Sequence, residues 1–339
     1  MNLKQLNTFG AQASAGHFFE ITDARTYQEL LSSSPQLISD ALILGGGSNI
    51  LFTRDYVPAV LRIGIKGISV EETDGNDILV TAGAGVVWDD LVQYCIQRGF
   101  YGIENLSLIP GCCGAAPMQN IGAYGVELVQ VFSHLEAMDR KTGEIKTFSN
   151  KDCRFGYRSS VFKTALKNRF IIASITLRLS RIARLTLEYG AISAELSQAG
   201  ITQPTPKDVS QAVIRIRRSK LPDWHAFGNA GSFFKNPVIP NEQFEEIRTK
   251  FPKVPHYAVS QYTTKVPAGW LIDQCGLKGY RMGNVGTWHQ QALVIVNYGS
   301  GSGAEILDFA RKIRDTVASR FNIQLEPEVN LIGMNQDDF

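Results

Sequence analysis

The chain has 339 residues, of which 44% are hydrophobic and 19% are charged, and this composition predicts a globular protein of two or three domains. Its formal net charge is only +2, which argues against nucleic acid or a membrane surface as a partner. The five cysteines match neither a disulfide framework nor zinc-ligand spacing. The N-terminus lacks an apolar signal core, and the apolar runs are too short to span a bilayer. We therefore expect a reduced, soluble, cytoplasmic protein without a metal. We also expect a monomer, although these observations do not determine the oligomeric state.

The first two thirds of the chain read as α/β and then α+β structure. A helix is predicted near residues 27–31, and strands near 41–44 and 57–63. A second helix is predicted over 88–98, because Val87, Leu91, Val92 and Cys95 share one face and Gly99 is placed to end it. Alternating patterns over 129–137 and 171–179 predict half-buried strands.

Two helices further along carry capping signals. Thr205 is a predicted N-cap, Pro206 occupies the first helical position, and Asp208 completes a capping box. Leu221-Pro222 ends this helix, and we place a domain boundary near residue 204. Ser302 and Glu305 predict a second boxed helix with an apolar face, whose members are Ile306, Phe309, Ala310, Ile313 and Val317.

Two glycine-rich segments are the strongest functional signal. An apolar strand runs into Gly45, Gly46, Gly47, Ser48 and Asn49, and residues 110–125 read PGCCGAAPMQNIGAYG. Such segments let backbone N–H groups approach an anionic or flat ligand closely. Together they suggest a dinucleotide held along its length, although two ordinary glycine-rich turns remain an alternative. There is no P-loop, and Gly83-Ala84-Gly85 lacks the third glycine of the Rossmann fingerprint.

Three further segments carry chemistry. Ser232 lies on a small-residue turn before two aromatics, where it fits a proton donor better than a hydrolase nucleophile, because no Gly-x-Ser-x-Gly elbow surrounds it. Arg158 stands beside two hydroxyl side chains. It is a candidate to bind a carboxylate and stabilise a developing enolate, and the alternative is that it forms an ion pair on the surface. Glu328 would have a raised pKa if it faces a cleft. The basic cluster at 215–220 is either a solvated helix face or a set of phosphate contacts.

Taken together, these segments resemble the UDP-N-acetylenolpyruvoylglucosamine reductase (MurB) family. The resemblance runs in family order through 45–49, 109–111, 119–125, 156–158, 231–237 and 326–329. It implies an α+β flavoprotein of three domains, with an FAD-binding fold of the vanillyl-alcohol-oxidase type and an α+β substrate-binding domain. The implied divisions are residues 1–66 and 67–204 for FAD, the latter rejoined by 322–339, and 205–321 for the UDP-sugar.

The resemblance also implies roles for individual residues. Ser232 resembles the proton donor, and Arg158 and Glu328 resemble the pair that polarises the enolpyruvyl carboxylate. Tyr189 resembles the tyrosine that caps the substrate in one subtype, while Lys220, Asn236 and Gln291 resemble substrate contacts. The implied contacts of non-covalent FAD are Gly45, Gly46, Gly47, Ser48, Asn49, Pro110, Gly111, Gly114, Ala115, Asn120, Gly122, Ala123 and Tyr124.

The implied reaction is the NADPH-dependent reduction of UDP-N-acetylglucosamine enolpyruvate to UDP-N-acetylmuramate, a step in peptidoglycan synthesis and so in cell wall biogenesis, cell shape and division. NADPH reduces FAD, hydride then enters carbon-3 of the enolpyruvyl group, and Ser232 protonates carbon-2. Cys112, Cys113, Ser159 and Asn330 depart from the family pattern without removing a catalytic group. Two alternatives are a related flavin oxidase, with Cys112 or Cys113 bonded to the flavin, and a non-catalytic nucleotide-binding module.

Overall fold

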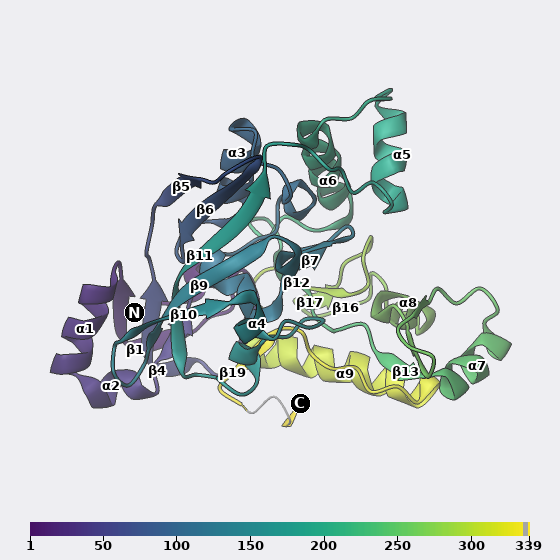
Figure 1. Ribbon diagram of the computed structural model, residues 1–339. Helices are drawn as coiled ribbons and strands as arrows, with labels where there is room; N and C mark the ends of the chain where they lie inside the picture. The colour runs from purple at the N-terminus through teal and green to yellow at the C-terminus, as the bar shows by residue number, and fades with distance from the viewer. Residues whose placement is uncertain (335–337) are drawn as a thin grey trace. The chain divides into compact units, whose positions relative to one another are not determined.

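The computed structural model describes residues 1–334 and 338–339, and Figure 1 labels its elements. Contacts divide the chain into two compact units. The first unit consists of Met1, Ala15–Gly46 and Pro58–Ser219, and the second of Asn2–Ser14, Gly47–Val57 and Lys220–Phe339. Each unit has its own hydrophobic core, one around Val80, Trp88 and Ile175 and the other around Phe233 and Phe309.

Helices and strands are interspersed along the chain. The helices are α1 (Ala24–Ser33), α2 (Pro35–Ser39), α3 (Trp88–Gln97), α4 (Asn150–Cys153), α5 (Gly190–Gln198), α6 (Pro206–Lys220), α7 (Asn241–Lys250), α8 (Ala268–Gln274) and α9 (Gly303–Phe321). The strands before residue 200 are β1 (Ser14–Ile21), β2 (Leu42–Leu44), β3 (Ile50–Phe52), β4 (Tyr56–Ile63), β5 (Ile68–Glu72), β6 (Asp77–Gly83), β7 (Gly122–Ala123), β8 (Val126–Glu127), β9 (Phe132–Asp139), β10 (Ile145–Ser149) and β11 (Phe170–Ser180). The later strands are β12 (Gly228–Ser232), β13 (Val238–Pro240), β14 (Tyr257–Ala258), β15 (Thr263–Lys265), β16 (Arg281–Met282), β17 (Val285–Thr287), β18 (Val294–Asn297) and β19 (Asn330–Ile332).

The first unit is built around an antiparallel sheet in the order β10-β9-β11-β6-β5. Its central strand β11 pairs on both sides, so its apolar residues are buried more continuously than a half-buried strand would require. The alternating pattern over 129–137 begins earlier than the strand that forms there. Residues 128–130 adopt a 3-10 turn held by a Glu127–Gln130 capping box, so β9 starts only at Phe132.

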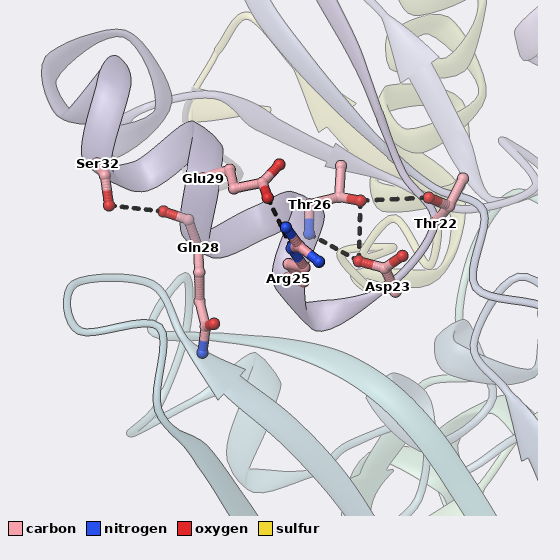
Figure 2. A network of polar contacts seen from close by, with 7 residues as sticks. All are labelled: Thr22, Asp23, Arg25, Thr26, Gln28, Glu29 and Ser32. Carbon is pink, nitrogen blue, oxygen red and sulfur yellow. Dashed lines mark hydrogen bonds and ion pairs between the residues drawn. The ribbon is translucent and has the colours of Figure 1, made fainter.

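A second sheet of the first unit has the order β1-β4-β2, and α1 follows directly after β1. Figure 2 shows the polar contacts at the start of this helix. Asp23 is the N-cap, and its carboxylate accepts hydrogen bonds from the Thr26 N–H at 2.7 Å and the Thr26 hydroxyl at 2.9 Å. These bonds lower the pKa of Asp23 and satisfy helix N–H groups that would otherwise lack acceptors.

The predicted caps of the later helices are confirmed. Thr205 and Asp208 exchange hydrogen bonds at the start of α6, and Ser302 and Glu305 do so at the start of α9. The predicted apolar face of α9, Ile306 to Val317, is buried. At the end of α3, Arg98 caps the helix and Gly99 takes the left-handed conformation with φ of 75°.

The second unit combines an antiparallel sheet, β12-β18-β17-β16, with smaller sheets β13-β15-β14 and β19-β3. The last of these is a long-range pairing, because Asn330, Leu331 and Ile332 align in parallel with residues 50–52. Phe309 and Ile313 on α9 are fully buried in the core of this unit. The pairing of β19 with β3 fixes the position of the adjoining segment that contains Glu328.

The units differ from the domain boundaries expected from the sequence. One division between the two units falls after Ser219, because α6 packs on α5 through a cluster that includes Val209 and Ile192. The domain boundary expected near residue 204 stays a prediction. The C-terminal strand pairs with β3 of residues 50–52, and residues 335–337 of the expected 322–339 segment lie outside the described residues. The division into three domains stays a prediction.

Candidate functional site

The predicted site residues lie in both compact units. The first unit holds Gly45, Gly46, Pro110, Gly111, Gly114, Ala115, Asn120, Gly122, Ala123, Tyr124, Arg158 and Tyr189. The second unit holds Gly47, Ser48, Asn49, Lys220, Ser232, Asn236, Gln291 and Glu328. The predicted FAD contacts and the predicted catalytic groups are therefore each shared between the two units.

Several glycines of the first unit allow one backbone to pack directly on another. A Cβ atom at Gly46 would lie 2.9 Å from the Cα of Gly111, and one at Gly114 would lie 2.5 Å from the Cβ of Ala84. Real Cβ atoms do not approach other heavy atoms so closely, so a side chain at either position would force the loops apart. These glycines bring residues 45–46, 83–85 and 111–115 into one layered loop cluster, a reason for glycine that does not depend on a ligand.

Gly45 differs from its neighbours in this cluster. A Cβ atom there would meet nothing closer than Ala115 at 3.9 Å and Cys112 at 4.0 Å, which are ordinary contacts. Gly47 has a φ of 64°, and a Cβ atom on it would overlap the carbonyl of Leu6. Backbone packing therefore explains glycine at 46 and 47 but not at 45.

Residues 116–128 form a tight loop in which two residues other than glycine adopt left-handed backbone conformations. Asn120 has φ of 46° and Tyr124 has φ of 51°. The buried Asn120 amide donates to Glu127 at 2.9 Å and to the carbonyl of Gly156 at 3.3 Å, and its oxygen accepts the N–H of Val129 at 3.0 Å. Its side chain is thus used to hold the loop. Such strain is typical of functional loops that their surroundings hold in place.

Arg158 is anchored to the same loop. Its Nη2 donates to the carbonyl of Gly122 at 3.1 Å, and its guanidinium carbon lies 5.5 Å from the centre of the Tyr157 ring. Arg158 also has a left-handed backbone, with φ of 51°, beside an isolated bridge between Gly156 and Ser159. The segment thus presents a fixed cation next to the predicted flavin loop.

Neither cysteine of the flavin-facing loop forms a disulfide. Cys113 is fully buried, and burial raises the pKa of its thiol far above the ordinary value. Cys112 is half-buried, and burial raises the pKa of its thiol as well, although Lys66 and Arg62 act in the opposite direction. Both thiols are therefore protonated near neutral pH, which does not suit nucleophilic attack.

In the second unit, Ser232 ends strand β12 at an irregularity. The pairing of β12 with β18 shifts register between Asn229 and Ser232, where Gly231 has φ of 69°. Asn229 stabilises the bend, because its Oδ1 accepts the N–H of Gly231 at 3.0 Å. Bulges commonly redirect a side chain at the edge of a sheet, and this one places the half-buried Ser232 next to the buried Phe233.

Glu328 lies beside this turn although it is far away in sequence. Its N–H donates to the carbonyl of Phe233 at 2.8 Å, and Pro327 bridges to Phe234. Its own carbonyl accepts a hydrogen bond from the Asn49 amide at 3.3 Å. The carbonyl of Asn49 in turn accepts the side-chain amide of Asn330 at 2.9 Å. The structure therefore brings together Ser232, Glu328 and Asn49, and it gives Asn330 a role that the sequence pattern did not reveal.

Two predicted substrate contacts are held by local hydrogen bonds. The side-chain oxygen of Asn236 accepts the N–H of Ala268 at 2.9 Å, and that of Gln291 accepts the N–H of Leu293 at 3.3 Å. In each case the carbonyl oxygen of the amide is engaged, which orients the NH2 group as a hydrogen-bond donor. Two oriented donors of this kind are suited to anionic oxygen atoms.

Lys220 and Tyr189 lie at the ends of two helices, α6 and α5. Lys220 is the exposed last residue of α6, and Tyr189 is the N-cap of α5 with 47% of its surface exposed. Within the basic cluster before Lys220, Arg215 forms an ion pair with Glu195 on α5 at 2.5 Å. Burial lowers the pKa of Arg217, opposed by nearby Tyr124 and Asp89. Arg217 is half-buried, with its Nε atom fully buried, whereas Arg215, Arg218 and Lys220 are exposed.

One depression of the surface lies away from all of these residues. It adjoins the outer side of α1 and is lined by Arg25, Gln28, Glu29, Ser32 and Ser33, several of which appear in Figure 2. Arg25 and Glu29 form an ion pair with each other at 2.8 Å.

Over residues 1–334 and 338–339, no helix is both long and apolar enough to cross a membrane.

Family models match both parts of the chain. Residues 19–149 match an FAD-binding domain, and residues 223–332 match the C-terminal domain of UDP-N-acetylenolpyruvoylglucosamine reductase. The expected fold class, an α+β flavoprotein with an FAD-binding domain and a separate α+β domain, is confirmed.

Individual relatives match along nearly the whole chain. The UDP-N-acetylenolpyruvoylglucosamine reductase of Chromobacterium violaceum is 47% identical over 329 residues, which are 97% of this chain and 96% of the relative. The Pseudomonas aeruginosa protein of the same name is 46% identical over 330 residues, 97% of each chain. The crystal structure of the reductase (MurB) from Thermus caldophilus has a TM-score of 0.66 at 22% identity, covering 98% of this chain and 97% of that one, and so supports the fold.

Proposed function

The chain belongs to the UDP-N-acetylenolpyruvoylglucosamine reductase family, and from this premise we propose which of its residues carry the family reaction. The protein is an FAD-dependent oxidoreductase that uses NADPH to reduce UDP-N-acetylglucosamine enolpyruvate to UDP-N-acetylmuramate in peptidoglycan synthesis. We propose that it acts as a monomer in the cytoplasm. The related oxidase and the non-catalytic nucleotide-binding module are set aside.

The glycine loops fit FAD. Gly45, Ala115 and Ala123 carry no bulky side chain, so a ligand can approach their backbone closely. Backbone N–H groups in such loops suit the two phosphates and the flavin carbonyls. When bound, FAD supplies the hydride transfer that side chains cannot perform. The packing of Gly46 on Gly111 and of Gly114 on Ala84 holds the loops in place before the cofactor arrives.

Arg158 is proposed to bind the carboxylate of the enolpyruvyl group. Its backbone strain and its bond to the Gly122 carbonyl fix the guanidinium, so little reorganisation is needed when negative charge develops. A guanidinium cannot lose its proton near neutral pH, and it therefore offers a permanent positive charge. Its role is electrostatic, and it neither donates nor accepts the transferred proton.

Ser232 is proposed to deliver the proton to carbon-2, with Glu328 acting beside it on the same enol group. The observation that carries this proposal is the hydrogen bond from the Glu328 N–H to the Phe233 carbonyl, which joins the segment of Glu328 to the turn of Ser232. A serine hydroxyl is a weak acid, so it works as a donor only when it is positioned within reach of the reacting carbon. The bulge at Gly231 provides such positioning.

Lys220, Asn236, Gln291 and Tyr189 are proposed to bind the UDP-sugar. The oriented amides of Asn236 and Gln291 donate hydrogen bonds to phosphate oxygens, and Lys220 contributes a mobile point charge. Tyr189 at the start of α5 caps the substrate. These contacts leave the reacting carbons to Arg158, Ser232 and Glu328.

The Ser232→Ala variant tests the assignment in a stopped-flow experiment. NADPH should bleach its flavin at nearly the wild-type rate, whereas reoxidation by the enolpyruvyl sugar should slow by at least ~10²-fold, the lower range for a positioned proton donor. Ser300→Ala, an exposed serine in another loop of the same unit, is the control and should change neither step. Equal slowing of both half-reactions in Ser232→Ala would contradict the role of Ser232.

A further inference from the structure

The first turn of helix α3, which Figure 1 labels, contacts the segment that leads into the predicted flavin loop. The indole N–H of Trp88 donates to the carbonyl of Leu106 at 3.0 Å, and its backbone N–H donates to the carbonyl of Gly111 at 2.9 Å. Between these two points, the carboxylate of Asp89 accepts the N–H of Leu108 at 2.6 Å. The turn therefore holds this segment at three successive points, and the middle one depends on a side chain that the proposed reaction does not use.

Leu108 has a left-handed backbone conformation, with φ of 60°. The leucine side chain crowds the backbone in this region, which glycine and asparagine adopt far more readily. Such a conformation persists only where the surroundings hold it in place. The bond to Asp89 provides a hold of this kind, because a hydrogen bond to a charged acceptor is stronger than one to a neutral acceptor.

The conformation of Leu108 sets the direction in which the chain enters the loop. Pro110 fixes its own φ through its ring, and it keeps the preceding Ile109 out of the helical region. The carbonyl of Gly111 is already bonded to α3. Leu108 is therefore the residue at which this stretch can most easily change course. A change there would displace Pro110, one of the implied FAD contacts.

Two other roles for the Asp89 carboxylate must be distinguished from this one. An acid in the first turn of a helix interacts favourably with the helix dipole, but the neighbouring Asp90 is exposed and does the same. Arg217 lies close enough to Asp89 for an electrostatic interaction. Both of these roles depend on the charge of Asp89, whereas the bond to Leu108 depends on an acceptor oxygen in the right place.

We propose that Asp89 is a positioning residue for the predicted flavin loop, which it pre-organises by holding Leu108 in the left-handed conformation. The inference rests on the proposed function, in which the glycine loops bind FAD. Asp89 acts through Leu108 and has no assigned contact with the cofactor or the substrate. Because the loop is held before FAD arrives, binding does not have to supply the free energy that would order it.

The first test measures the affinity for FAD. A dilution series of the FAD-loaded full-length protein, in which flavin fluorescence reports the released cofactor, gives the dissociation constant. Asp89→Ala should raise this constant by at least about tenfold, as expected when a hydrogen bond to a charged group is lost. Asp89→Asn keeps an acceptor oxygen and should stay within about threefold of the wild type. Asp90→Ala, the matched control, removes an exposed acid from the same turn and should change the constant by less than about twofold.

The second test asks whether Asp89 acts through Leu108. Glycine adopts the left-handed conformation without strain, so Leu108→Gly reduces the need for the carboxylate. In that background, Asp89→Ala should raise the dissociation constant by only about threefold or less. An equal fold-change in both backgrounds would show that Asp89 acts elsewhere, for example on Arg217, and it would overturn the proposal. Equal effects of Asp89→Ala and Asp89→Asn would also overturn it, because they would point to the charge.

Amide hydrogen exchange of Leu108, followed by NMR, tests the hold itself and does not require a variant that folds. In the wild type, this N–H should exchange at least about tenfold more slowly than in an unstructured peptide, both with FAD bound and after FAD has been removed. Unprotected exchange in the FAD-free protein would show that the cofactor orders the loop, and it would overturn the proposal.

The same measurement separates the inference from the proposed function. In Asp89→Ala, exchange at Leu108 should become about tenfold faster, and unchanged exchange would overturn the proposal. Faster exchange with an unchanged dissociation constant for FAD would support the positioning by Asp89. It would count instead against Pro110 and Gly111 as FAD contacts in the proposed function. The two ideas can therefore fail separately.

Discussion

The glycine loop cluster of the first unit and the Ser232 turn of the second unit both carry predicted site residues, yet they are built in opposite ways. In the loop cluster, backbone packs on backbone, as at Gly46 with Gly111 and at Gly114 with Ala84. At the Ser232 turn, backbone hydrogen bonds such as that from Glu328 to Phe233 hold the segments. The proposed chemistry there belongs to the side chains.

Because of this difference, substitutions in the loop cluster should change stability and function together. Substitutions of the side chains at the Ser232 turn should change function alone. A substitution in the loop cluster changes the packing that shapes the proposed cofactor site, so it should affect folding and FAD binding together. A substitution of a proposed catalytic side chain at the Ser232 turn leaves the backbone bonds in place. It should therefore remove activity while the protein stays folded.

The largest effect is expected for Glu328→Gln, which removes the charge and nearly keeps the shape. The N–H and carbonyl of residue 328 retain their bonds to Phe233 and Asn49, so the melting temperature should stay close to that of the wild type. Turnover should fall by about 10²-fold or more if the carboxyl group acts in the enol step. Steady-state kinetics and calorimetry with the UDP-sugar distinguish the possibilities, because a weaker affinity with intact turnover would make Glu328 a binding residue.

Lys220→Ala tests whether the exposed lysine at the end of α6 contributes to substrate binding without contributing to stability. The side chain is exposed, so stability should be unaffected, whereas UDP-sugar binding should weaken by ~1.5–3 kcal/mol, the range for a hydrogen bond to a charged group. Binding of the sugar should also become less sensitive to salt, since one charge pair is lost. Titration calorimetry at two ionic strengths checks both effects. An unchanged affinity would remove Lys220 from the proposed substrate site.

Gly114→Ala tests the loop cluster, and Gly45→Ala is its matched control. A methyl group at position 114 meets Ala84 at 2.5 Å and should destabilise the protein by ~1–3 kcal/mol through overpacking. At position 45 the methyl group meets only ordinary contacts, so stability should hold, while FAD affinity should fall if the cofactor passes over this glycine. Thermal unfolding of the apoprotein and flavin content of the purified protein separate the two effects. Equal loss of stability in both variants would contradict the distinction between these glycines.

Much of this architecture could be predicted from local patterns. Capping boxes at Thr205 and Ser302 and the apolar face of α9 depend on neighbours within one turn, and the structure confirms them. The sequence pattern marks the glycines as special, but their packing against Ala84 or Gly111 is a long-range property that no local pattern contains. The same holds for the pairing of β19 with β3 and for the bond from Asn330 to Asn49.

Arg217 shows the limit of sequence patterns most clearly. On the sequence it is one of several basic residues at a helix end, and such residues are usually solvated. Arg217 is instead half-buried with its Nε atom fully buried, on a helix that packs against α5 and the distant Tyr124. Which of the four basic residues would be the least exposed could not be read from their spacing.

The smallest predicted effect concerns the cap of α6, the helix that carries Arg217. Hydrogen bonds from the Thr205 hydroxyl and N–H lower the pKa of Asp208 below its ordinary value. A carboxyl group whose pKa is lower in the folded state stabilises the fold above its unfolded pKa, and this contribution is lost as the pH falls through the folded pKa. Thr205→Ala removes both the cap and the hydroxyl donor, so it should cost ~0.5–1 kcal/mol at neutral pH. The difference in melting temperature from the wild type should then shrink in acid, below the ordinary carboxyl range. A difference that stays constant from neutral pH into acid would mean that Asp208 does not contribute through its charge, and that α6 is held by its packing on α5 alone.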